Sequence, residues 1–105
     1  MTFQTIDIEQ GKQLIENNDL IIVDVRDSGA YRASHIENAR HISDANVEDF
    51  IQTSDKNQTL LIYCYHGHTS RAAAEYFANA GFTDVYSLDG GFESWRCKYP
   101  VVSAD

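Results

Sequence analysis

The chain has 105 residues and a net charge of −8, and its length is that of one ordinary domain. Hydrophobic residues make up 43% of it and charged residues 23%, which is typical of a globular protein and excludes an intrinsically disordered one. The excess of acidic residues argues against a nucleic acid or an anionic membrane surface as partner. The N-terminus has no basic segment followed by an apolar stretch, so we expect one soluble, cytoplasmic domain over residues 1–105.

The first predicted elements are a short strand and a helix. Residues 3–6 include the aromatic and β-branched side chains that strands favour. A helix is predicted to begin after Asp7, a favourable N-cap residue, and Gln10 stands where it completes a capping box. The apolar residues of one helix face are Ile8, Leu14 and Ile15.

Two further strands and a second helix follow. Residues 20–23 form an uninterrupted apolar run, which is typical of a strand buried on both faces of a parallel sheet. Residues 40–42 indicate a shorter strand. A helix is predicted behind Asp44, and its apolar residues at helical spacing are Val47, Phe50 and Ile51.

The second half of the chain carries the strongest helical pattern, between strands predicted over residues 60–63 and 85–88. Thr69 or Ser70 is expected to cap the start of this helix, and Gly81 to end it. Its apolar face comprises Ala72, Ala73, Tyr76, Phe77 and Ala80. Alternation of strand and helix predicts an α/β fold with a five-stranded, mostly parallel sheet and helices on both faces. Functional residues are then expected at the carboxyl ends of the strands.

Cys64 stands where an apolar strand ends and a short loop leads into that helix. The free N–H groups and positive dipole end of a helix N-terminus favour a thiolate over a thiol. Gly67 allows the loop to curl so that successive N–H groups point inward around an anion. We therefore predict Cys64 as a nucleophile. The predicted anion-binding residues are Tyr65, His66, Gly67, His68, Thr69, Ser70 and Arg71.

The surroundings of Cys64 are locally positive, because residues 56–74 contain Lys56 and Arg71 but no Asp or Glu. Two other interpretations of Cys64 stay open at this point. A lone cysteine beside a strand can simply be a small buried hydrophobic residue. Cys64, His66 and His68 can also be the ligands of a zinc ion, although three ligands in so tight a loop converge poorly on a tetrahedral ion. We expect no metal and no other cofactor.

Five segments of the chain match the pattern of a known family. Their sequences include Val-Asp-Val-Arg-Asp, Cys-Tyr-His-Gly and Asp-Gly-Gly-Phe-Glu, and the segments cover residues 23–27, 34–39, 64–71, 88–95 and 99–101. In this order they resemble the recurring segments of the rhodanese-homology domain, and most closely those of its single-domain thiosulfate sulfurtransferases. The resemblance implies a rhodanese-like fold for nearly the whole chain.

The resemblance also implies a reaction. The Cys64 thiolate attacks the outer sulfur of thiosulfate, releases sulfite and retains the sulfur as a persulfide. A second nucleophile, which is cyanide, a dithiol or thioredoxin, then removes that sulfur. Ping-pong kinetics follow from such a covalent intermediate. Arg71 and His66 are expected to attract the dianionic donor.

Other residues in the matching segments have structural interpretations. Asp24 and Arg26 are expected to pin the turn after their strand through an ion pair, and His35 to make a local hydrogen bond. Gly90 and Gly91 are expected to turn the backbone beside the Cys64 loop. Trp95 is predicted to lie in the core. Cys97 is expected to be a bystander thiol, with a disulfide to Cys64 as the alternative.

Two other functions compete with small-molecule sulfur transfer. Cdc25-like phosphatases share the fold and the cysteine loop, but their Cys-x5-Arg spacing places an arginine where this chain has Ser70, one residue before Arg71. A persulfide carrier that delivers sulfur to a protein partner needs the same Cys64 as a sulfurtransferase does. The sequence does not separate the carrier from the enzyme.

Overall fold

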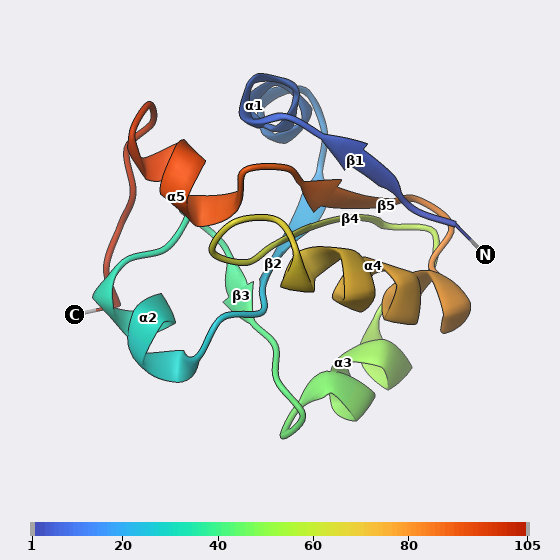
Figure 1. Ribbon diagram of the computed structural model, residues 1–105. Helices are drawn as coiled ribbons and strands as arrows, with labels where there is room; N and C mark the ends of the chain where they lie inside the picture. The colour runs from blue at the N-terminus through green and yellow to red at the C-terminus, as the bar shows by residue number, and fades with distance from the viewer. Residues whose placement is uncertain (1, 105) are drawn as a thin grey trace.

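The computed structural model describes residues 2–104, in which five strands form one sheet with helices against both faces (Figure 1). Every pairing between these strands is parallel, and their order across the sheet is β1-β5-β4-β2-β3. This confirms the predicted α/β architecture. The elements in chain order are β1 (Gln4–Ile6), α1 (Ile8–Asn17), β2 (Leu20–Asp24), α2 (Ser28–Ala33), β3 (Arg40–His41), α3 (Val47–Thr53), β4 (Thr59–Tyr63), α4 (Thr69–Asn79), β5 (Val85–Leu88) and α5 (Gly91–Arg96).

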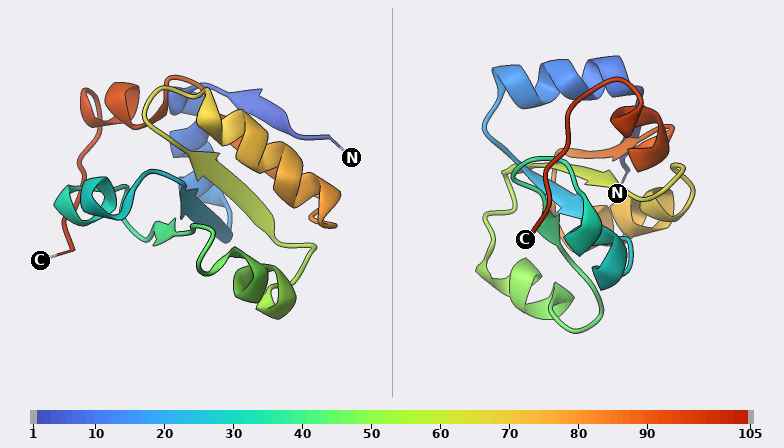
Figure 2. Two further views of the ribbon diagram at one scale, coloured as in Figure 1. Left: turned by 60° about the horizontal axis from the view of Figure 1, so that its bottom comes forward. Right: turned by 90° about the vertical axis from the view of Figure 1, so that its left-hand side faces the viewer.

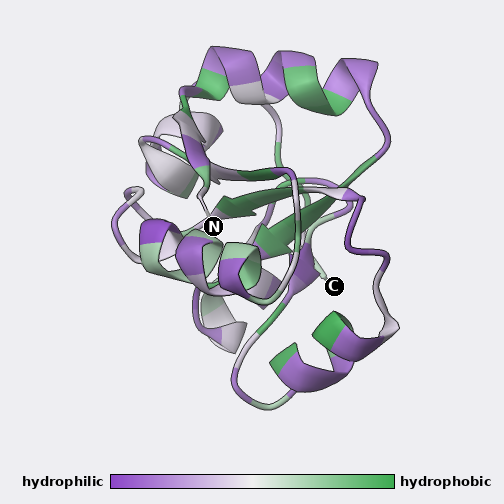
Figure 3. Ribbon diagram, turned by 90° about the vertical axis from the view of Figure 1, so that its right-hand side faces the viewer, coloured by the Kyte–Doolittle hydropathy of each residue, from purple (hydrophilic) through white to green (hydrophobic). Residues whose placement is uncertain are grey.

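The apolar runs of β2 and β4 form the buried centre of the sheet, as predicted. Successive residues of a strand point to opposite faces, so Leu60 and Ile62 join the core against α3 and α4, whereas Leu61 and Tyr63 join the core against α1 and α5. The two helix layers lie on opposite sides of the sheet (Figure 2, right). The central strands are hydrophobic, and the helices turn their hydrophilic residues outward (Figure 3).

The start of α1 and the end of α4 follow the predicted capping. The Asp7 carboxylate accepts a hydrogen bond from the Gln10 backbone N–H at 2.8 Å, and the Gln10 side chain accepts one from the Asp7 N–H at 3.1 Å. Just after the end of α4, Gly81 adopts a φ of +114°, in the left-handed region that glycine reaches without strain. Both helix boundaries are therefore determined by local sequence.

The predicted cap of α3 was wrong, and one helix was not predicted. Asp44 does not cap α3: the N-cap residue is Asn46, and its side chain accepts a hydrogen bond from the Ser43 N–H at 2.7 Å, within the preceding turn. The short helix α2 was not predicted, because it lacks an apolar face. Its one local signal is Asp27, whose carboxylate caps it by accepting a hydrogen bond from the Ala30 N–H at 3.1 Å.

A buried ion pair holds the turn after β2, which confirms the interpretation of Asp24 and Arg26. Arg26 Nη2 lies 2.7 Å from Asp24 Oδ2, and both side chains are almost fully buried. The same nitrogen donates to the Ser34 carbonyl at 2.7 Å, and the guanidinium stacks 4.0 Å from the centre of the Phe92 ring. The Tyr63 hydroxyl donates to Asp24 Oδ2 at 2.7 Å. Burial and the Asp24 carboxylate raise the pKa of Tyr63, so this phenol remains a proton donor.

The topology brings three connections together at one end of the sheet. The Val25 N–H donates to the Tyr63 carbonyl at 3.1 Å, which ties the end of β2 to the end of β4. The Phe92 N–H donates to the Cys64 carbonyl at 2.8 Å, which ties the start of α5 to the loop after β4. Figure 2 (left) shows this loop beside the connection from β5 to α5. The carboxyl ends of the central strands therefore frame Cys64.

Replacing Arg26 by methionine is expected to lower the free energy of unfolding by about 3–5 kcal/mol, because the Asp24 carboxylate then stays buried without its counter-charge. Urea unfolding followed by circular dichroism measures the change. Arg96→Met is the matched control, since Arg96 pairs with Glu93 at 3.0 Å on the exposed surface, where ion pairs contribute little. Equal losses in the two variants would contradict a stabilising role for the buried pair.

Candidate active site

Cys64 is the first residue after β4, and its sulfur is surrounded by backbone donors. The Gly67 N–H and the Ser70 N–H both point at Sγ, with N···S distances of 3.2 Å and 3.3 Å. The residue is only 5% exposed, so these bonds act in a site that is largely closed to water. A thiolate at this position has fixed partners for its negative charge.

The start of α5 orients this loop by binding its carbonyl groups. The Phe92 N–H donates to the Cys64 carbonyl at 2.8 Å, and the Glu93 N–H donates to the Tyr65 carbonyl at 3.0 Å. In a trans peptide the C=O and the following N–H point in opposite directions. The Tyr65 carbonyl therefore faces α5 while the His66 N–H faces the sulfur.

Two glycines make this close packing feasible. Gly67 has a φ of +102°, and a Cβ there would lie 3.1 Å from the Gly90 nitrogen. Gly91 has a φ of +59°, and a Cβ there would lie 2.5 Å from the Tyr65 carbonyl oxygen. The latter distance is shorter than any real contact, so only glycine fits without displacing the loop. This confirms that the turn at Gly90 and Gly91 lies beside the Cys64 loop.

The prediction that Thr69 or Ser70 caps the start of α4 was wrong. The N-cap residue is His68, whose side chain makes no capping hydrogen bond to the described residues, and Thr69 and Ser70 lie inside the helix. The Ser70 N–H, which a capping side chain would otherwise satisfy, donates to Cys64 Sγ. The thiol of Cys64 therefore takes over part of the capping role.

The hydroxyl groups of Ser70 and Ser87 form a buried pair that was not predicted. Both residues are completely buried, and their Oγ atoms lie 2.8 Å apart. With Ser87 as the donor of this bond, the Ser70 proton is available to the sulfur of Cys64. The signal in the sequence is a serine inside the otherwise apolar strand β5.

These contacts lower the pKa of the Cys64 thiol. Burial alone raises it, but the hydrogen bonds that favour the thiolate outweigh burial: they come from the Ser70 hydroxyl and N–H and from the Gly67 and His66 N–H groups. The net result is a thiol that ionises more readily than an ordinary cysteine.

Some loop residues line a small pocket beside the sulfur, and others lie outside it. A cavity of about 160 Å³ adjoins the sulfur, and its lining consists of Cys64, Tyr65, His66, His68 and Thr69. The side chain of Arg71 is exposed, and its Nη2 lies 3.4 Å from the Asp89 carboxylate. The structure thus gathers the predicted residues from Tyr65 to Ser70 around the sulfur and places Arg71 outside the pocket lining.

Tyr65 connects the loop to α2 through a bond that was not foreseen. Its hydroxyl donates to Asp27 Oδ1 at 2.8 Å, and the bond raises the pKa of Tyr65 and lowers that of Asp27. Its ring centre also lies 5.4 Å from the Arg26 guanidinium. The exposed side of the loop is therefore anchored to the same turn that the buried ion pair stabilises.

The other residues of the matching segments have structural positions. His35 Nδ1 lies 2.7 Å from the Tyr31 carbonyl oxygen, which confirms the local bond, and Trp95 is buried in the core. Cys64 and Cys97 both lie in the described part of the chain, and both are free thiols, Cys97 being exposed.

The described residues show neither a metal cluster nor a membrane span. Across residues 2–104, no three His, Cys, Asp or Glu side chains gather closely enough to hold a metal ion. None of the helices in this range has the length and apolar character needed to cross a membrane.

The fold and the site define a class: a parallel α/β domain that presents one cysteine from a loop between a strand and a helix N-terminus. The rhodanese-like domain model matches residues 7–98, and the chain belongs to this family. It is 52% identical over 100 residues to thiosulfate sulfurtransferase GlpE of Pseudomonas paraeruginosa, with 95% of this chain and 90% of the relative covered. The Pseudomonas putida protein of the same name is 45% identical over 102 residues, covering 97% and 93%.

A solved structure agrees with this assignment. The rhodanese-like domain protein from Staphylococcus aureus superposes with a TM-score of 0.77 at 28% identity, and the match covers 89% of this chain and 91% of that one. The family predicted from the five segments is therefore confirmed.

Replacing Ser70 by alanine is expected to raise the pKa of the Cys64 thiol, because burial persists while one donor to the thiolate is lost. The pH dependence of iodoacetamide alkylation, followed by intact mass, measures this pKa. The experiment uses a Cys97→Ser background so that only Cys64 reacts. Ser103→Ala removes a hydroxyl at an exposed position and is the control. An unchanged alkylation midpoint in Ser70→Ala would show that this hydroxyl does not stabilise the thiolate.

Proposed function

We propose that this protein is a thiosulfate sulfurtransferase that acts through a persulfide on Cys64. The observation that carries the proposal is the pair of N–H bonds that Cys64 Sγ accepts from Gly67 and Ser70. Such a site stabilises negative charge on sulfur both before and after sulfur transfer. The names of the Pseudomonas relatives support the same activity.

The first half-reaction breaks the S–S bond of thiosulfate. The Cys64 thiolate attacks the outer sulfur, a new S–S bond forms, and sulfite leaves with the electrons of the broken bond. The negative charge then resides on the outer sulfur of the persulfide, close to the N–H groups of the loop. The small cavity of about 160 Å³ beside Cys64 suits one sulfur atom and a compact anion.

The second half-reaction regenerates the thiolate. Cyanide attacks the outer sulfur and leaves as thiocyanate, or a dithiol or thioredoxin accepts the sulfur as a new persulfide. In either case the Cys64 thiolate is the leaving group, and its lowered pKa favours its departure. These displacements at sulfur need no metal or organic cofactor. We assign the reaction to one catalytic domain over residues 1–105. We place this domain in the cytoplasm, where thiols stay reduced.

Arg71 is proposed to draw the dianionic donor toward the site. Its guanidinium pairs with Asp89 at 3.4 Å on the exposed surface, and a pair of this kind costs little to break. His66 lines the pocket itself. The exposed position of Arg71 also argues against phosphatase activity, which needs an arginine that grips the phosphoryl oxygens over the nucleophile.

Incubation with thiosulfate is expected to add the mass of one sulfur atom to the protein, as measured by intact mass spectrometry. Cyanide should remove this mass. Cys64→Ser should not acquire it, because the serine hydroxyl is not ionised near neutral pH and forms no persulfide, whereas Cys97→Ser should behave as the unchanged protein does. A wild-type mass that thiosulfate leaves unaltered would refute the proposed function.

Arg71→Ala is expected to raise KM for thiosulfate roughly two- to fivefold with little change in kcat, because a charge at an exposed position contributes modestly to binding. The difference should shrink as ionic strength rises. Steady-state kinetics with cyanide as acceptor measure both constants. Arg96→Ala is the control for loss of a positive charge elsewhere, and an equal rise in KM there would show that Arg71 has no local role.

A further inference from the structure

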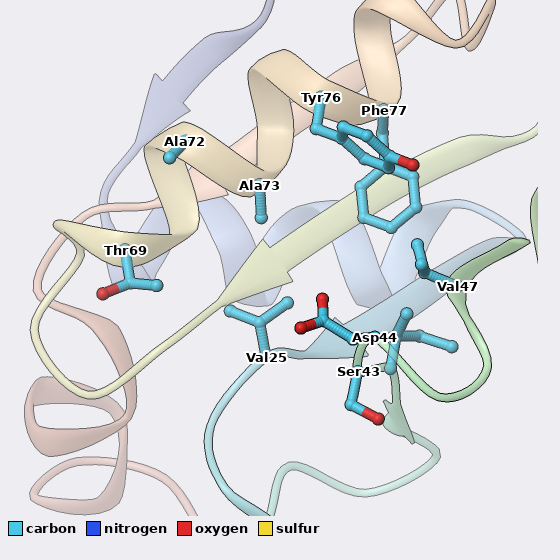
Figure 4. A pocket seen from close by; sticks show the side chains of 10 residues that line it. Val25, Ser43, Asp44, Val47, Thr69, Ala72, Ala73, Tyr76 and Phe77 are labelled. Carbon is cyan, nitrogen blue, oxygen red and sulfur yellow. The ribbon is translucent and has the colours of Figure 1, made fainter.

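A second, larger cavity lies next to the catalytic loop. It has a volume of about 410 Å³, which is within the range of small-molecule sites, and it opens between α4 and the segment from β3 to α3 (Figure 4). Most of its lining is apolar: Val25, Ile42, Val47, Ala72, Ala73 and Phe77. The small side chains of Ala72 and Ala73 leave this space beside α4 unfilled.

This cavity adjoins the pocket of the nucleophile. Thr69, the first residue of α4, lines both the larger cavity and the small cavity beside Cys64. Val25, on the opposite wall, is bonded through its N–H to the Tyr63 carbonyl, one residue before the nucleophile. The two cavities are therefore neighbours that share Thr69 as a lining residue, and the smaller of them adjoins the sulfur.

The cavity has a negative electrostatic character that the small pocket lacks. Among the described residues that line it, Asp44 alone is charged, and its carboxylate points into the cavity toward α4 (Figure 4). At Tyr76, another lining residue, the hydroxyl donates to the Glu48 carboxylate at 2.8 Å, which brings a second acid to the rim. Asp44 is exposed, and a ligand that combines an aliphatic body with a positive charge complements both this acid and the apolar lining.

The donor does not fit this description. Thiosulfate is a compact dianion, which the N–H groups around Cys64 attract and which Asp44 repels. An acceptor thiol, in contrast, must bring its sulfur to the outer atom of the persulfide while the rest of the molecule needs a place to bind. The larger cavity provides apolar surface for that part next to the small cavity beside Cys64.

We propose that this cavity binds the body of the sulfur acceptor, and that it selects aliphatic thiols carrying a cationic group, with Asp44 as the specificity-determining residue. The inference rests on the proposed function and names its second substrate class. The bound thiolate attacks the outer sulfur of the Cys64 persulfide, forms a new S–S bond, and leaves as an alkyl persulfide. The Cys64 thiolate departs with the electrons of the broken bond, so no oxidant or reductant is needed.

The test follows discharge of a preformed persulfide in a single turnover. The protein is loaded with thiosulfate, freed of excess donor, and checked by intact mass. It is then mixed with one of three six-carbon thiols that differ at the far end: 6-aminohexane-1-thiol, 6-hydroxyhexane-1-thiol or 6-mercaptohexanoate. Each rate is divided by the cyanide rate of the same protein preparation, because cyanide is too small to need the cavity.

The amino thiol is expected to discharge the persulfide roughly two- to fivefold faster than the hydroxy thiol, and the carboxylate more slowly than both. Asp44→Asn should remove this ranking. Ala73→Leu, which keeps a good helix former, should fill the cavity and slow all three thiols relative to cyanide. Asp49→Asn is the matched control, since it removes an exposed acid of α3 that does not line the cavity.

Equal rates for the three thiols would overturn the inference, as would an Asp49→Asn variant that loses the ranking to the same extent as Asp44→Asn. A persulfide that never forms with thiosulfate would instead refute the proposed function. If the persulfide forms and cyanide discharges it, the proposed function stands, and equal rates for the three thiols then count against the inference alone.

Discussion

The candidate site depends on one interaction, the clamping of the Cys64 and Tyr65 carbonyls by the first N–H groups of α5. Because the two ends of a peptide unit point in opposite directions, fixing the carbonyl of Tyr65 toward α5 directs the next N–H toward the sulfur. The loop thereby becomes a set of donors around Sγ. Gly91 is indispensable to this arrangement, since a Cβ at that position would collide with the loop backbone.

The turn after β2 supports these hydrogen bonds between α5 and the loop. The Arg26 guanidinium is paired with Asp24 and stacks on Phe92, the residue whose N–H holds the Cys64 carbonyl. Tyr65 reaches from the loop to Asp27 in that turn. Charged and aromatic groups far apart in sequence thus brace one short loop, and the reactive sulfur lies on a rigid support.

The net charge of −8 and a site for anions are compatible because the two act over different distances. The overall charge is carried mainly by exposed acids, whose fields are screened within about a Debye length. The donors at Cys64 act at 3.2–3.3 Å in a buried position, where screening is weak. The larger cavity with Asp44 shows that acidic groups also lie close to the site, although they line a different surface.

The sequence alone determined the order of the main strands and helices, the capping of α1 and the place of Cys64 between a strand and a helix, because these features depend on local periodicity and on neighbouring side chains. Tertiary structure decided what no local pattern encodes. The Ser70–Ser87 and Arg71–Asp89 contacts join segments at least 17 residues apart. Among the described residues no side chain caps α4, and the Cys64 sulfur accepts the hydrogen bond from the Ser70 N–H. Such contacts exist only once the parallel sheet has brought the ends of β4 and β5 together.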